Sequence, residues 1–112
     1  MRVKSFKFTD SSNNDKNLGG TDVDGTIDHA NNTITLELPS GVTMDTGAIA
    51  NTVTLKPTIV LGGDDTTTVS PNTETSTQFT IDGSTAVEYT VTGADGMTKT
   101  YKITVSKASS SG

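Results

Sequence analysis

The stretch VEYTVTGADGMTKTYKITV, residues 87–105, decides the fold. Residues 87–92 alternate apolar and polar side chains, and residues 101–105 repeat the alternation, which is the two-residue period of a half-buried β-strand. Between the two runs stands Asp95-Gly96, a pair that tolerates the positive φ angles of a tight hairpin turn. The stretch therefore predicts a β-hairpin.

A second hairpin is predicted upstream, in GTIDHANNTITLEL, residues 25–38. Residues 33–38 alternate isoleucine or leucine with threonine or glutamate, so one face of this strand is apolar. Asn31-Asn32 supplies a turn before the strand, and Ile27 lies on the preceding arm.

The N-terminal run VKSFKF, residues 3–8, predicts a further strand with Phe6 and Phe8 on one face. Val3 is out of phase with the two phenylalanines. An edge strand that changes sheets or carries a β-bulge would explain this slip.

The middle of the chain is less regular. Residues 51–61 predict two short strands, and Pro57 lies at the break between them because proline cannot donate a hydrogen bond to a sheet. Residues 66–71 and 77–82 each predict one more short strand.

About seven short strands separated by turn signals, with no segment of helical periodicity, predict an all-β sandwich. The connection at residues 40–51 is expected to plug one end of the core with Val42, Met44 and Ile49. The core that the alternation predicts consists of Phe6, Phe8, Ile27, Ile34, Leu36, Leu38, Val53, Leu55, Ile59, Leu61, Phe79, Ile81, Val87, Tyr89, Val91, Tyr101, Ile103 and Val105.

The composition fits one small domain with a polar exterior. The chain has 112 residues, of which 30% are hydrophobic and 19% charged, with a net charge of −5. Threonine, serine and asparagine take the place of the missing apolar residues. We expect a domain at residues 1–106, and a flexible linker or cloning remnant at residues 107–112.

Several functions are disfavoured by the residue content. The acidic balance argues against nucleic acid and anionic membranes as partners. There is no cysteine, so disulfides and thiolate sites are excluded. The N-terminal MRVKSFKFTD lacks the apolar run of a signal peptide or membrane span. Because His29 is the only histidine and no nucleophile–base pair stands out, we predict no catalytic residue, no metal site, no cofactor and no enzyme.

The closing hairpin resembles the end of immunoglobulin-like modules in bacterial cell-surface lipoproteins and secreted multidomain proteins, which typically reads YTVTAEDGSTKTYTVTV. The other motifs that the chain shares with these modules, in the same order, are VKSFKF, DVDGTID, NTITLELP, KPTIVL, TVSP and TQFT. The likeness runs from about residue 3 to about residue 105, and it is to modules of the domain-of-unknown-function type.

The resemblance implies an immunoglobulin-like β-sandwich of about seven antiparallel strands that spaces, displays or assists binding beside other domains. It implies no catalytic residues. The chain departs from the pattern at residues 62–71, GGDDTTTVSP, a connection longer than is usual in such modules.

The stretch TDVDGTID, residues 21–28, looks like part of an EF-hand calcium loop. With Gly25 at the sixth position of that pattern, however, the first position is Gly20 and the twelfth is Asn31, and neither carries the required carboxylate. The segment is therefore interpreted as a turn at Asp24-Gly25 that leads into a strand.

A calcium site of another kind remains an alternative. It would use the carboxylates of Asp22, Asp24 and Asp28, with a contribution from residues 62–65. The domain would then be a calcium-stiffened linker.

Glycan binding is the other alternative. Sugar sites on β-sandwiches usually offer a flat aromatic side chain, but the chain has no tryptophan. Tyr89 and Tyr101 share the alternation phase of buried residues, so both are predicted to be core residues whose hydroxyls reach polar partners. Contacts to a glycan through asparagine, aspartate and threonine in loops stay open.

The sequence thus predicts a non-catalytic spacer or display module of a larger bacterial surface or secreted protein. We expect it to be extracellular and monomeric, with neighbouring domains of the parent protein, and in one alternative glycans, as partners. Nucleic-acid binding and membrane insertion are not expected.

Overall fold

The computed structural model describes residues 2–45, 51–62, 66–72, 74–81 and 85–108. These residues form strands, turns and bends but no helix, so the prediction of an all-β fold is confirmed. In chain order, the strands are β1 (Arg2–Phe8), β2 (Val23–Asp24), β3 (Thr26–Asp28), β4 (Thr33–Leu38), β5 (Thr52–Leu55), β6 (Pro57–Gly62), β7 (Thr66–Ser70), β8 (Thr77–Thr80), β9 (Val87–Gly93) and β10 (Thr98–Lys107).

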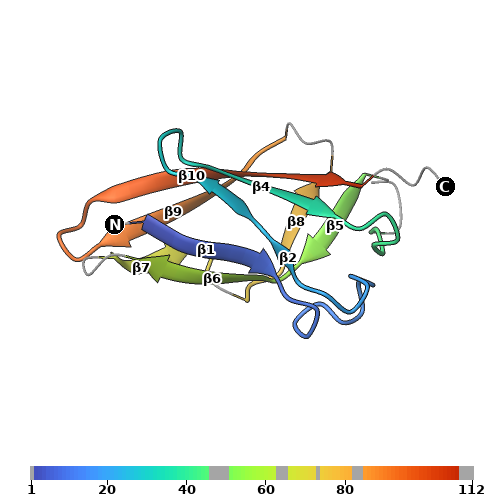
Figure 1. Cartoon of the computed structure of the whole chain (residues 1–112). Helices are drawn as coiled ribbons and strands as arrows, with labels where there is room; N and C mark the ends of the chain where they lie inside the picture. Colours follow the sequence, from blue (N-terminus) through green and yellow to red (C-terminus); the bar gives the residue numbers. More distant parts are fainter. Residues whose placement is uncertain (1, 46–50, 63–65, 73, 82–84, 109–112) are drawn as a thin grey trace.

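The strands form three sheets, with the orders β3-β4-β10-β9-β7, β2-β1-β6 and β5-β8. In Figure 1, β4 and β10 lie on one side of the molecule, and β1 and β6 lie on the other. The described residues contain ten strands, where the sequence predicted about seven. One of the additional strands arises because residues 23–28 divide at Gly25 into β2 and β3.

One strand pair also departs from the predicted antiparallel arrangement. The final strand, β10, lies between β9 and β4, and it pairs in parallel with β4 from Lys102 opposite Thr33 to Lys107 opposite Leu38. Parallel neighbours need a long crossover, and residues 39–97 supply it.

The closing hairpin is confirmed. β9 and β10 pair antiparallel, with Tyr89 opposite Tyr101. The N–H of Gly93 donates to the carbonyl of Met97 at 2.8 Å, which closes the turn. Gly96 has a φ of 84°, so glycine is needed at the position where Asp95-Gly96 predicted the turn.

The second predicted hairpin is formed by β3 and β4, with Ile27 opposite Ile34. Asn32 has a φ of 55°, a left-handed conformation that asparagine tolerates. The Oδ1 of Asp28 accepts a hydrogen bond from the N–H of Ala30 at 3.0 Å and thereby orders the turn.

β1 carries the predicted bulge, because its register with β6 shifts between Val3 and Ser5. The shift turns Val3 inward, where it is buried. The prediction that this strand lies at an edge is wrong: β1 is the middle strand of its sheet. On one side β1 pairs antiparallel with the short strand β2, with Lys7 opposite Asp24.

The predicted break at Pro57 separates two strands of different sheets, since β5 pairs with β8 and β6 pairs with β1. The side chain of Asn13 holds the chain at this break. Its Oδ1 accepts a hydrogen bond from the N–H of Lys56 at 2.7 Å, and its Nδ2 donates to the carbonyl of Lys56 at 3.0 Å. Asn13 is only 2% exposed, so these bonds are shielded from water.

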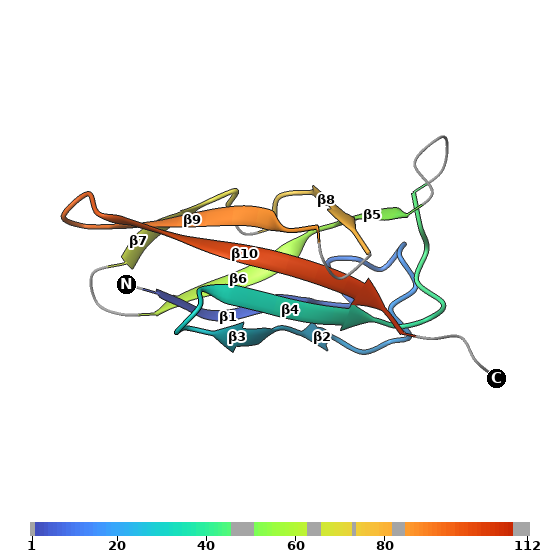
Figure 2. The ribbon, with the colours of Figure 1, turned by 90° about the horizontal axis from the view of Figure 1, so that it is seen from above.

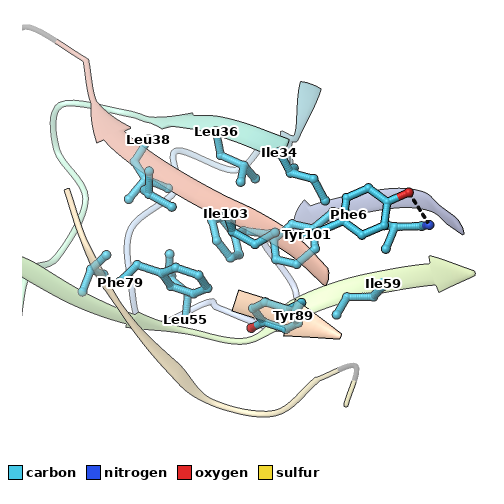
Figure 3. Packing of buried hydrophobic residues seen from close by; sticks show 14 of the residues in the cluster. Phe6, Ile34, Leu36, Leu38, Leu55, Ile59, Phe79, Tyr89, Tyr101 and Ile103 are labelled. Carbon is cyan, nitrogen blue, oxygen red and sulfur yellow. Dashed lines mark hydrogen bonds between the residues drawn. The ribbon is translucent and has the colours of Figure 1, made fainter. Parts of the chain in front are cut away.

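The core lies between the layers, as Figure 3 shows for Phe6, Phe79, Tyr89 and Tyr101. The rings of Phe6 and Tyr89 meet edge to face, with centroids 5.2 Å apart. All of the predicted core is buried except four residues at strand ends or on edge strands, which are partly buried against it, namely Ile27, Leu61, Ile81 and Val87. Buried hydrophobic residues that belong neither to the predicted core nor to the predicted plug are Val3, Leu18 and Val69.

The predicted plug is confirmed in part. Val42 is buried, and Met44 is partly buried and packs against the core. The third residue of the predicted plug, Ile49, lies outside the described residues.

The molecule is elongated, with extents of 48 × 26 × 25 Å. β1 begins toward one end of the long axis, where the turn between β9 and β10 extends beyond it, and β10 ends toward the other end (Figures 1 and 2).

Candidate functional site

A groove of about 570 Å³ lies between β2 and β4, near the end of β10. We refer to it as the β2–β4 groove. The residues that line it include Leu18 and Leu36, whose side chains are buried. The polar side chains that line it are hydroxyls and carboxylates, including Thr26, Thr35, Ser106, Asp22, Asp24 and Glu37.

The groove exists because the chain changes sheets at Gly25. Before this residue β2 pairs with β1, and after it β3 pairs with β4. The N–H of Gly25 donates to the carbonyl of Phe6 at 2.8 Å, and a Cβ at this position would lie 2.7 Å from that carbonyl oxygen. Only glycine fits so close an approach. Because β2 leaves β4 here, the two strands enclose an open space.

The crossing leaves part of the β4 backbone open. Thr35 of β4 pairs with Thr26 of β3. Two residues further along β4, at Glu37, the neighbouring segment has left the strand, because Asp24 pairs with β1 instead. Glu37 pairs with Ser106 of β10 on its other side. Among the described strands, none pairs with Glu37 on the groove side, so its peptide groups there can bond to a ligand or to water.

The groove is acidic. The Oδ1 of Asp22 accepts a hydrogen bond from the N–H of Asp10 at 3.0 Å, and its Oδ2 lies 4.0 Å from the ammonium of Lys7. The carboxylates of Asp24 and Glu37 have no hydrogen-bond or ion-pair partner within the described chain. Both are exposed and can accept hydrogen bonds from a ligand.

The three aspartates of the alternative calcium site do not come together. Asp22 and Asp24 line the groove, whereas the carboxylate of Asp28 orders the β3–β4 turn. Hydrogen bonds from the side chain and the backbone of Asn31 lower the pKa of Asp28. Within the described residues, no three carboxylate or histidine side chains form a group that could hold a metal ion. Of the predicted contribution from residues 62–65, residues 63–65 lie outside the described part.

The two tyrosines are core residues with bonded hydroxyls, as predicted. The hydroxyl of Tyr89 donates to Oγ1 of Thr77 at 3.0 Å, and burial raises the pKa of Tyr89 despite this bond. The hydroxyl of Tyr101 lies 3.0 Å from Nδ1 of His29 and accepts a hydrogen bond from the N–H of Val3 at 3.4 Å (Figure 3).

No phenylalanine or tyrosine ring is available for a sugar to stack on. All three phenylalanines and both tyrosines of the chain lie in the described part and are buried, and the sequence has no tryptophan. A ligand of this domain would therefore have to be held by polar groups and by aliphatic side chains.

The sequence does not predict the groove, although two of its carboxylates belong to the candidate calcium site. The alternation places Glu37 and Thr35 on the polar face of their strand and gives them no role. The available signal was Gly25 itself, because a glycine inside a strand pattern often marks a close backbone approach.

Away from the groove, Asp45 joins β5 to β8 by accepting several hydrogen bonds. Its donors are the hydroxyls of Thr52 and Thr54 at 3.0 and 3.1 Å, the N–H of Thr54 at 3.1 Å, and the side-chain amide of Gln78 at 3.2 Å. Burial raises the pKa of Asp45, but these hydrogen bonds outweigh it and lower the pKa below its ordinary value.

We expect Asp45 to contribute to stability above the ordinary aspartate pKa of about 3.9, and this contribution to be lost as the pH falls through the lower folded value. The Asp45→Asn variant should therefore lose stability at neutral pH and show a flatter acid limb of its stability curve. Denaturant unfolding as a function of pH measures both effects. The matched control is Asp15→Asn, since Asp15 is exposed. An unchanged acid limb in Asp45→Asn would contradict the expectation.

The described residues include no helix with the length and apolar character needed to cross a membrane. Residues 4–105 match a family model described as SGBP, N-terminal. The chain is also similar to a DUF4623 family protein from Bacteroides eggerthii, with a TM-score of 0.61 and 19% identity over 96% of this chain and 21% of that chain. The match to this crystal structure shows the fold alone. None of the curated proteins compared with the chain matches it.

Proposed function

We propose, from the premise that this chain belongs to the SGBP N-terminal family, that it is a non-catalytic spacer module of a larger glycan-binding surface protein. The family is one of cell-surface, glycan-binding and non-enzymatic proteins. This chain spans only 21% of its structural relative, which is consistent with a module in a longer protein.

One observation carries the proposal: the direction of the chain along the long axis. The first strand begins toward one end of a body 48 Å long, beside the closing hairpin that extends beyond it, and the last strand ends toward the other end (Figure 2). Such a module separates whatever precedes it from whatever follows it along its long axis. We propose that residues 1–106 form this unit as an immunoglobulin-like sandwich, monomeric and exposed at the cell surface.

The test compares the soluble parent protein with a version that lacks residues 1–106. We expect its affinity for a short oligosaccharide that fills its main binding site to change less than about twofold, because a spacer does not touch that site. Small-angle scattering should show the largest dimension shortened by a large part of the 48 Å length of the module. Calorimetry measures the affinity.

Two results would contradict the spacer role. A loss of oligosaccharide affinity of more than about tenfold would place this domain in the main binding site. A largest dimension that hardly changes would mean that the module folds back beside its neighbour.

A further inference from the structure

We propose that the β2–β4 groove binds a short stretch of an uncharged polysaccharide. The choice of a glycan rests in part on the proposed function, since the chain belongs to a family of glycan-binding proteins. The other support comes from the groove itself. Its volume of about 570 Å³ lies in the usual range for ligand sites of about 300–1,000 Å³.

The polar groups of the groove suit sugar hydroxyls. The carboxylates of Asp24 and Glu37 can accept hydrogen bonds from them, and neither has another partner within the described chain. The hydroxyls of Thr26 and Thr35 can donate or accept, and the open peptide edge of Glu37 offers one N–H and one carbonyl. A polyol, in which every hydroxyl both donates and accepts, matches this mixture.

The charge of the groove excludes acidic sugars. Three carboxylates line it, and Lys7, 4.0 Å from Asp22, is the one cation paired with any of the three within the described chain. An anionic polysaccharide would be repelled. The aliphatic side chains of Val23 and Pro39, both partly exposed, can contact the C–H face of a sugar ring.

An extended peptide is the competing ligand, because open strand edges recruit strands. Here the open edge is too short. Thr35 is already paired with β3, and the strand ends at Leu38, whose carbonyl accepts a hydrogen bond from the N–H of Ala108 at 2.7 Å. This leaves Glu37 as the one β4 residue with an open edge on the groove side in the described structure, and strand addition uses a series of alternate residues.

The affinity should be low. Without an aromatic platform, and in an open groove, we expect a Kd on the order of 1 mM for a hexasaccharide. Such a contact acts as an accessory site, which increases the retention of a long polysaccharide already held by the main site of the parent protein.

The test uses the 112-residue chain labelled with nitrogen-15 and hexasaccharides of a neutral α-glucan, a neutral β-glucan and a neutral β-mannan. We expect at least one of them to shift the backbone amide signals of Thr26, Thr35 and Glu37. The double variant Asp24→Asn/Glu37→Gln should weaken that binding at least about tenfold.

The matched control is Glu88→Gln/Asp95→Asn, which makes the same charge change outside the groove, on β9 and in the closing hairpin. It should bind as the unaltered chain does. Equal weakening in both double variants would overturn the site, and so would the absence of shifts with all three glycans. Shifts with a lysine-rich heptapeptide but with none of the glycans would overturn it in favour of a peptide site.

Failure of this test leaves the spacer role standing, because neither double variant alters the length of the module. Conversely, a module that folded back on its neighbour would refute the spacer role without changing the titration of the isolated chain.

Discussion

The Gly25→Ala variant is expected to lose about 2–3 kcal/mol of unfolding free energy. Its Cβ would lie 2.7 Å from the carbonyl oxygen of Phe6 and 2.8 Å from Cγ2 of Ile34. The first of these is a backbone atom, so relief requires the sheets to separate and the hydrogen bond from Gly25 to Phe6 to lengthen. Alanine also lowers the conformational entropy of the unfolded chain, which stabilises the fold by about 0.4–1 kcal/mol. This gain is smaller than the free-energy cost of the clash.

Urea denaturation of the purified variant measures this loss. The control is Thr26→Ala, since the adjacent threonine is exposed and its replacement should cost less than about 1 kcal/mol. If Gly25→Ala were as stable as the control, the close approach of the two sheets at this point would be refuted.

The Asn13→Ala variant is expected to lose about 3 kcal/mol. The substitution removes the side-chain partners of both the N–H and the carbonyl of Lys56. The carbonyl of Thr9 loses the bond from Asn13 Nδ2 at 3.0 Å but keeps the one from the backbone N–H of residue 13 at 3.2 Å. Asn13 is 2% exposed, so water cannot replace these bonds without opening the loop.

Two further variants make this expectation specific. The neighbouring Asn14 is exposed, and Asn14→Ala should change stability by less than about 0.5 kcal/mol. Asn13→Asp keeps the acceptor for the Lys56 N–H but loses both donated bonds, so it should lie well below the unaltered chain in denaturant unfolding. Similar stabilities for Asn13→Ala and Asn14→Ala would rule out the bridging role of Asn13.

The local part of the fold could be predicted from the sequence because its cause is local. Alternation of side chains and a turn pair define the hairpin at residues 87–105, and the same signals define the one at residues 25–38. The bulge in β1 was also predictable, since Val3 is out of phase with Phe6.

What the sequence did not reveal depends on partners far along the chain. Asn13 lies in a polar stretch typical of a solvated loop, and its partner Lys56 is 43 residues away. The position of β1 in the middle of its sheet depends on the return of β2. The parallel pairing of β4 with β10 likewise joins segments that no local pattern connects.

The groove combines both cases. Its carboxylates at positions 22 and 24 stand out as a motif, but that motif predicts a turn, with a calcium site as the alternative. Its geometry arises from the change of sheets at Gly25, which brings Glu37 beside those carboxylates. Periodicity predicts which side chains face outward, but it does not predict which outward faces meet.

The parallel pairing of β4 with β10 also has a mechanical consequence. β1 begins toward one end of the body and β10 ends toward the other, so tension applied between these two points would pull along the strands (Figure 1). The hydrogen bonds that join β10 to β4, from Lys102 to Lys107, run across that direction. Such a force would load these bonds together in shear rather than open them one by one. Force applied through the ends of this domain therefore meets the strand pairing in its most resistant geometry.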